Sequence, residues 1–176
     1  MSIFEHLAVC FAGAALLASG TGQAAGPGFG RPAMADEVVA WDISIPPDGS
    51  GLPPGSGTAN QGAVVYMAKC VSCHGEKGIG KPADALVGGI GTLASATPLK
   101  TVGSYWPYAT TLFDYVRRAM PYDKPMSLSS DEVYAVSAYI LSLNGIIPED
   151  AAMDARALPK VKMPNRNGFV DYWRQR

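Results

Sequence analysis

The feature that most constrains this chain is a five-residue run that contains two cysteines and a histidine, Cys70-Val71-Ser72-Cys73-His74. The chain has three cysteines and two histidines in all, and the remaining two, His6 and Cys10, lie within its first ten residues. If that beginning is removed, every thiol and imidazole of the mature chain falls within these five positions. A site that needs more cysteine or histidine ligands is then excluded.

The first 25 residues are predicted to be a signal peptide for export. The apolar run from Leu7 to Ala18 has about the length of a signal h-region and is too short to span a bilayer easily. Small residues around Ala24 offer a cleavage site. The run is preceded by Glu5 and His6 but by no Lys or Arg, so an uncleaved membrane anchor stays open as the alternative. Export predicts a periplasmic protein with no membrane span after cleavage.

Three kinds of site use a Cys-x-x-Cys pair. A thioredoxin-like redox site would follow a strand in a βαβ pattern, and the sequence has no such pattern. A zinc site would need further Cys or His ligands, which the mature chain lacks. Covalent haem attachment needs two thiols for the vinyl groups and an adjacent imidazole for the iron. We therefore predict one covalently attached haem c, with Cys70 and Cys73 as attachment residues and His74 as an iron ligand.

Two arms are expected to flank a small domain at residues 60–146 and to wrap over it. The N-terminal arm, residues 26–59, is rich in Gly and Pro, but its apolar segment Val38 to Ile43 is suited to docking on a surface. The C-terminal arm, residues 147–176, is polar and interrupted by proline, apart from three aromatic residues, Phe169, Tyr172 and Trp173.

Helical signals dominate residues 60–146. Asn60 is expected to cap a helix from Gln61 to Cys73 that carries the haem motif at its end. Thr110 or Thr111 is expected to cap a second helix, Leu112 to Ala119, which Pro121 ends.

The third helix has the clearest pattern. Ser129 and Glu132 have the spacing of a capping box, apolar residues recur at helical intervals after them, and Asn144-Gly145 supplies a stop. Residues 75–103 contain many glycines and are expected to form a long loop. The fold class predicted is all-α, a small helical domain with long loops and extended arms.

No histidine remains for the other side of the iron, so a methionine is predicted there. Met67 lies on the helix that leads to His74 and cannot readily reach the opposite face. Met120 follows a helix and precedes Pro121 in a loop that can be held stiffly, and we predict it as the ligand. Met126, in the same loop, stays open as the alternative.

Three further residues are candidates near the cofactor. The carbonyl of Pro82, eight residues after His74, is predicted to accept a hydrogen bond from the second ring nitrogen of that histidine. Tyr105 and Trp106 are candidates for contacting the haem propionates or the edge of the pocket, with ordinary packing as the alternative. The net charge of −1 gives no surplus that would attract nucleic acid or an anionic membrane.

The haem motif, Met120-Pro121-Tyr122 and Ala138-Tyr139-Ile140 together resemble class I cytochromes c. A narrower resemblance, from about Trp41 to Phe169, is to the SoxD-type cytochrome subunit of bacterial sulfite (sulfur) dehydrogenase. It rests on longer strings, chiefly Lys100-Thr101-Val102-Gly103-Ser104-Tyr105-Trp106-Pro107-Tyr108-Ala109-Thr110-Thr111-Leu112-Phe113-Asp114-Tyr115, Leu143-Asn144-Gly145-Ile146-Ile147-Pro148-Glu149-Asp150 and Met163-Pro164-Asn165-Arg166.

This resemblance implies a role and partners. SoxD-type subunits associate with a molybdenum-cofactor subunit and pass its electrons on to a downstream cytochrome c or oxidase. It also implies His74 and Met120 as axial ligands and arms that bind the partner. Two alternatives stay open: a freely diffusing periplasmic carrier that serves other dehydrogenases, and a catalytic haem enzyme with an open sixth position. The second is disfavoured, because no acid or base group is evident near Met120.

Overall fold

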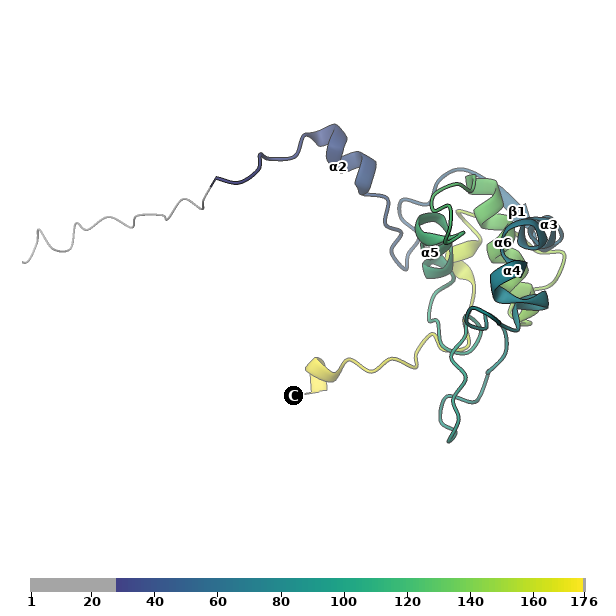
Figure 1. Cartoon of the computed structure of the whole chain (residues 1–176). Helices are drawn as coiled ribbons and strands as arrows, with labels where there is room; N and C mark the ends of the chain where they lie inside the picture. The colour runs from purple at the N-terminus through teal and green to yellow at the C-terminus, as the bar shows by residue number, and fades with distance from the viewer. Residues whose placement is uncertain (1–27, 176) are drawn as a thin grey trace, which may run out of the picture. The chain divides into compact units, whose positions relative to one another are not determined.

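The structure is a computed structural model that describes residues 28–175, so the predicted signal peptide, residues 1–25, lies outside the described residues. The chain divides into two compact units, one ending at Trp41 and one beginning at Asp42. The second unit holds the haem motif and the helices α3 to α6 (Figure 1). None of the described helices is long and apolar enough to cross a bilayer.

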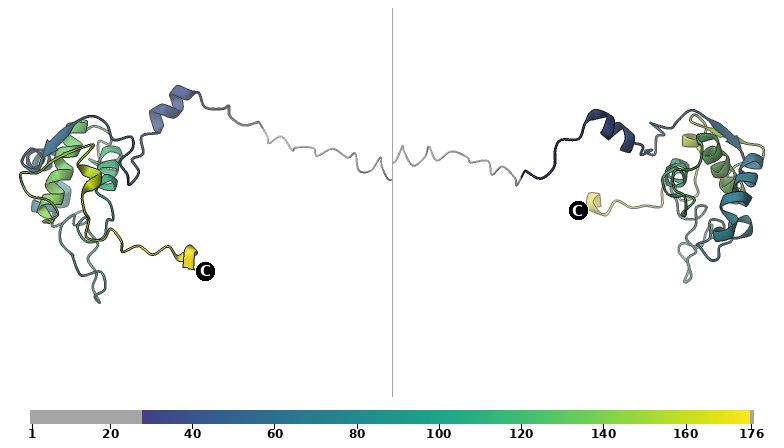
Figure 2. Two further views of the ribbon diagram at one scale, coloured as in Figure 1. Left: turned by 180° about the vertical axis from the view of Figure 1, so that it is seen from behind. Right: turned by 45° about the horizontal axis from the view of Figure 1, so that its top comes forward.

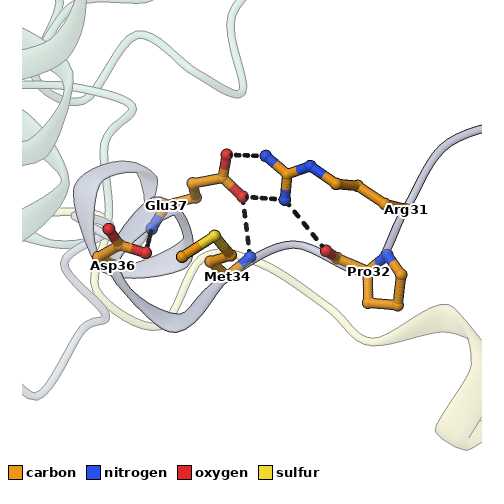
Figure 3. Close-up of polar contacts among 5 residues, drawn as sticks. All are labelled: Arg31, Pro32, Met34, Asp36 and Glu37. Carbon is orange, nitrogen blue, oxygen red and sulfur yellow. Dashed lines mark hydrogen bonds and ion pairs between the residues drawn. The ribbon is translucent and has the colours of Figure 1, made fainter.

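The first unit contains a short helix, α2, Ala35–Trp41, within the segment predicted to dock on a surface. Its first turn is fixed by Glu37, whose carboxylate accepts a hydrogen bond from the backbone N–H of Met34 at 2.8 Å and pairs with Arg31 (Figure 3). The Arg31 hydrogen bond lowers the pKa of Glu37, and an anion at this end complements the helix dipole. None of the residues of α2 is buried.

Two helices cross in the second unit, α3, Ala59–Lys69, and α6, Ser130–Leu143. Gly62 of α3 meets Ala135 of α6 so closely that an added Cβ at Gly62 would overlap the Ala135 carbonyl. The rings of Tyr66 and Tyr139 pack beside this point, with centroids 5.3 Å apart. The crossing therefore depends on the absence of a side chain at Gly62.

Capping boxes start both of these helices. Thr58, and not the predicted Asn60, is the N-cap of α3: its hydroxyl accepts from the N–H of Gln61 at 3.3 Å, and the Gln61 side chain accepts from the Thr58 N–H at 2.9 Å. The Asn60 prediction was wrong because it overlooked this Thr-x-x-Gln spacing. The box of Ser129 and Glu132 on α6 is confirmed, with bonds of 3.2 and 2.8 Å. The predicted stop is also confirmed, since Asn144 caps the end of α6.

Helix α5, Ala109–Ala119, begins earlier than the predicted Leu112, and neither Thr110 nor Thr111 caps it. Its N-cap is Tyr108, which makes no side-chain capping bond, and Thr110 instead donates a hydrogen bond to the N-terminal arm. Burial of its inner face, which begins at Ala109, replaces the side-chain cap that the sequence was expected to supply.

The arms are joined by a small antiparallel sheet. Strand β1, Ser56–Thr58, pairs with β2, Ala152–Asp154, and both contact α6. Apolar side chains of both arms are buried in the core: Ile45, Met153, Leu158, Val161 and Met163. Two 3-10 turns, η2 (Leu158–Lys160) and η3 (Tyr172–Gln175), complete the C-terminal arm.

The helices of the second unit are arranged around α6, which lies between α3 and α5 in Figures 1 and 2. Phe113 of α5 and Tyr134 of α6 pack at a centroid distance of 4.5 Å. The predicted loop after His74 is present and includes a single 3-10 turn, η1, Glu76–Gly78. The helical core with long loops and arms agrees with the predicted fold class, and the two three-residue strands are too short to have left an alternating pattern.

Candidate haem site

The cysteine and histidine motif lies at a break between two helices. Helix α3 ends at Lys69, and a short helix, α4, Val71–His74, follows at once. Cys70 stands between them with φ −125°, so the single helix predicted to run to Cys73 was wrong at this residue. The break leaves Cys70 half-buried and Cys73 exposed.

Cys70 and Cys73 form no disulfide with each other. Burial raises the pKa of the Cys70 thiol to about 11. Over residues 28–175, no three His, Cys, Asp or Glu residues come together to hold a metal ion.

The ring of His74 is oriented by a backbone carbonyl. Its Nδ1 lies 2.9 Å from the carbonyl oxygen of Asp84. Because a carbonyl only accepts, Nδ1 carries the proton and Nε2 keeps the lone pair that a metal would take. The prediction of Pro82 as the acceptor was wrong by two residues. The N–H of Ala83 donates to the Cys73 carbonyl at 2.8 Å, and the next residue, Asp84, places its carbonyl beside the ring.

The backbone just after His74 is held on two sides. The buried Tyr66 donates its hydroxyl proton to the carbonyl of Gly75 at 2.8 Å, and the N–H of Gly80 donates to the carbonyl of His74 at 2.8 Å. Gly75 has φ 71°, and an added Cβ there would press on the carbonyl of Gly80. A glycine is therefore required next to the histidine.

The two candidate methionines differ in their surroundings. Met120 caps the end of α5, where its N–H donates to the Val116 carbonyl at 3.1 Å, and its half-buried side chain packs against the core. Met126 is 60% exposed. Because a thioether must be held in place to ligate a metal, these surroundings favour Met120. His74 is the last residue of α4 and Met120 follows the last residue of α5, so the two candidate ligands come from separate helices of the second unit (Figure 1).

Tyr105 and Trp106 are half-buried and contact other protein groups. The Tyr105 ring packs edge-on against Phe169 at 5.2 Å, and its carbonyl accepts a hydrogen bond from the Asn165 side chain at 2.7 Å. The Trp106 ring packs edge-on against Tyr115 at 5.7 Å. These are the contacts of the packing alternative, and a role of either residue in cofactor binding stays a prediction.

The residues present fit a covalently bound haem. Cys70 and Cys73 offer two free thiols at the attachment spacing, His74 offers Nε2 because its Nδ1 is occupied, and Met120 offers a thioether held at a helix end. Two contributors were missed by the sequence prediction. Tyr66 could have been noticed as an aromatic residue one helical turn before Cys70, whereas Asp84 acts through its backbone and leaves no signal in residue type.

Comparison with known proteins gives two matches. A model of the cytochrome c family matches residues 59–144. The crystal structure of the sulfane dehydrogenase SoxCD from Paracoccus pantotrophus contains a chain that is 41% identical, with a TM-score of 0.77, and the match covers 85% of this chain and 74% of that one. No curated protein matches the sequence. The structural match extends beyond the region of the family model and therefore takes in residues of the arms.

Proposed function

The chain belongs to the class I cytochrome c family, and from that premise we propose that it is the electron-transfer subunit of a molybdenum-dependent sulfur dehydrogenase. Membership of the family brings one covalently bound haem c. The observation that carries the proposal is the 41% identity over 85% of the chain to a component of a sulfane dehydrogenase. The family model alone, over residues 59–144, would suit many electron carriers, whereas the continuation of the match into the arms points to a dehydrogenase subunit.

Four of the described residues would hold the cofactor, two by covalent attachment and two as ligands of the iron. Cys70 and Cys73 would each add a thiol across one vinyl group and so tie the haem to the break between α3 and α4. His74 would bind the iron through Nε2, with its ring fixed by the carbonyl of Asp84. Met120 would supply the second ligand from the end of α5. When bound, the haem iron accepts and releases one electron at a time.

Two iron ligands supplied by the protein favour a role in electron transfer and disfavour catalysis by this chain alone. With His74 and Met120 both bound, no position is left open for a substrate. The sulfur compound would then be oxidised on the molybdenum partner, and this chain would pass the electrons to a downstream cytochrome c or oxidase. The export signal predicted at residues 1–25 would place this exchange in the periplasm.

The test is to purify the tagged, haem-loaded full chain from its native host and to record what accompanies it. We expect molybdenum in the purified material by elemental analysis. We also expect prompt appearance of the reduced haem spectrum on addition of sulfite or of a sulfane-sulfur donor such as thiosulfate. A chain that emerges alone, with a haem that stays oxidised, would overturn the proposal in favour of a freely diffusing carrier.

A further inference from the structure

We propose that Asp114 is a positioning residue for Met120 and acts by holding helix α5 in place. Residues 43–47 of the N-terminal arm, here called the brace, are the segment to which α5 is hydrogen-bonded. This inference rests on the proposed role of Met120 as an axial ligand.

Asp114 is a buried carboxylate that accepts three hydrogen bonds, one from the arm and two from Arg118 on its own helix. The residue is 8% exposed and lies midway along α5. Its Oδ1 accepts from the backbone N–H of Ile45 at 3.0 Å and from Nε of Arg118 at 3.1 Å, and its Oδ2 accepts from Nη2 of Arg118. Ile45 is itself buried in the core. A buried anion is tolerated only when it is bonded in this way, so the contact fixes α5 against the arm.

The brace lies along α5 and is antiparallel to it. Near the start of the helix, Thr110 donates to the carbonyl of Pro47 at 3.4 Å, and near its end Arg117 donates to the carbonyl of Ile43 at 3.5 Å. The bond from Ile45 to Asp114 lies between these two and is the shortest of the three. Asp114 is therefore the central attachment between the helix and the arm.

Movement of α5 is transmitted directly to Met120. Met120 follows the last residue of the helix, and its N–H remains bonded to the carbonyl of Val116. Arg118, the ion-pair partner of Asp114, lies two residues before the methionine. A neutral thioether ligand stays bound only where the protein holds it within a fraction of an ångström, so loosening α5 should loosen the ligand.

The test compares Asp114→Asn with a matched control in the haem-loaded full chain. The control is Asp131→Ala, because Asp131 also accepts a backbone N–H of the arm, from Ser56 at 2.8 Å, but lies on α6, which does not lead to Met120. The readouts are the far-red absorption band of thioether-ligated ferric haem and the affinity for imidazole, which competes with the methionine. Thermal unfolding is measured alongside to separate ligand release from loss of fold.

We expect Asp114→Asn to weaken the far-red band and to raise imidazole affinity about tenfold, the factor given by about 1.4 kcal/mol of lost ligand stabilisation. Asp131→Ala should leave both unchanged. If Asp114→Asn proves too unstable, the double variant Thr110→Val with Arg117→Met loosens the brace while keeping the carboxylate, and should raise imidazole affinity less. Lower stability with unchanged imidazole affinity would overturn the proposal and leave Asp114 a structural residue.

The variant Met120→Ala tests the assignment of Met120 as a ligand separately from the positioning role of Asp114. If Met120→Ala leaves the far-red band and imidazole affinity as they were, the ligand assignment itself is wrong. If Met120→Ala changes them and the Asp114 variants do not, only the positioning role is lost.

Discussion

The Nδ1 of His74 donates to the backbone carbonyl of Asp84 across 2.9 Å, and this bond decides which ring nitrogen is left for a metal. It predicts that in the reduced, diamagnetic protein the Nδ1 proton of His74 exchanges with solvent more slowly than that of a free imidazole, because it is donated to a backbone carbonyl. A proton–nitrogen-15 correlation spectrum would detect this ring N–H, and a nuclear Overhauser cross-peak would connect its proton to the backbone next to Asp84. Exchange as fast as that of a free imidazole would contradict the assignment.

Replacement of Met120 by alanine should change the reduction potential and the imidazole affinity of the haem more than replacement of Met126 does. Met120 is half-buried against the core while Met126 is largely exposed. For Met120→Ala we expect the reduction potential to fall by on the order of a hundred millivolts, within the ~0.8 V range that axial ligands set. The haem should also gain affinity for imidazole. Met126→Ala is the control, and a larger effect there would reverse the assignment of the ligand.

The crossing of α3 over α6 should not tolerate a side chain at Gly62. A Cβ there would overlap the carbonyl of Ala135, so the helices would have to separate. We expect Gly62→Val to lower the free energy of unfolding by about 3 kcal/mol, the upper part of the range for overpacked sites. Urea unfolding of the haem-loaded chain measures this. The control is Asn60→Ala at an exposed position of the same helix, whose free energy of unfolding should stay within about 0.5 kcal/mol of wild type. If both variants lose the same free energy of unfolding, the close approach of the two helices does not account for the effect.

Features set by neighbouring residues were predictable from the sequence. The box of Ser129 and Glu132 depends on two side chains three positions apart, and both bonds are present. Thr58 and Gln61 carried the same kind of signal, which the assignment to Asn60 overlooked. The motif at residues 70–74 likewise lies within one local stretch, so its chemistry could be inferred without knowledge of the fold.

Features set by distant contacts were not predictable. The early start of α5 depends on burial of its face and not on a cap. The acceptor for His74 is Asp84 and not Pro82 because of the path of the loop, which residue types do not reveal. The bond from Ile45 to Asp114 joins residues 69 positions apart, and no pattern in a single sequence pairs them.

Glu132 should make part of the stability dependent on pH. The hydrogen bond from the N–H of Ser129, with a 3.0 Å ion pair to Lys69 of α3, lowers the pKa of Glu132. A carboxyl with a lower pKa in the folded state stabilises the fold above its unfolded pKa, near 4.3, and this contribution is lost as pH falls through the folded value.

Glu132→Gln keeps the capping geometry but removes the charge. We expect it to be less stable than wild type by about 0.5 to 1 kcal/mol at pH 7. The difference should shrink as the pH falls below the unfolded pKa and close below the lowered folded pKa, where the wild-type carboxyl is also neutral. Urea unfolding at a series of pH values from 7 downward provides the comparison, with the exposed Glu149→Gln as control. A difference that persists at low pH would mean that the charge is not its cause.

Helix α2 should contribute to binding the dehydrogenase partner and not to folding of the haem domain. Its Val39 is 72% exposed and its Trp41 is 85% exposed, and a seven-residue helix is too short to be stable in water without a surface to pack on. Large apolar side chains that become buried at an interface commonly account for much of its binding energy.

The variant Val39→Ser with Trp41→Ala should therefore keep the thermal stability and reduction potential of wild type. Its affinity for the molybdenum subunit should be at least about tenfold weaker, which corresponds to about 1.4 kcal/mol. Val64→Ser on α3 is the matched control, because Val64 is 71% exposed but lies outside the arm. Titration of the purified partner against each variant, followed by calorimetry, measures the affinities. Equal affinity of the α2 variant and wild type would exclude α2 from the interface, and a lowered thermal stability would mean that α2 packs within this chain instead.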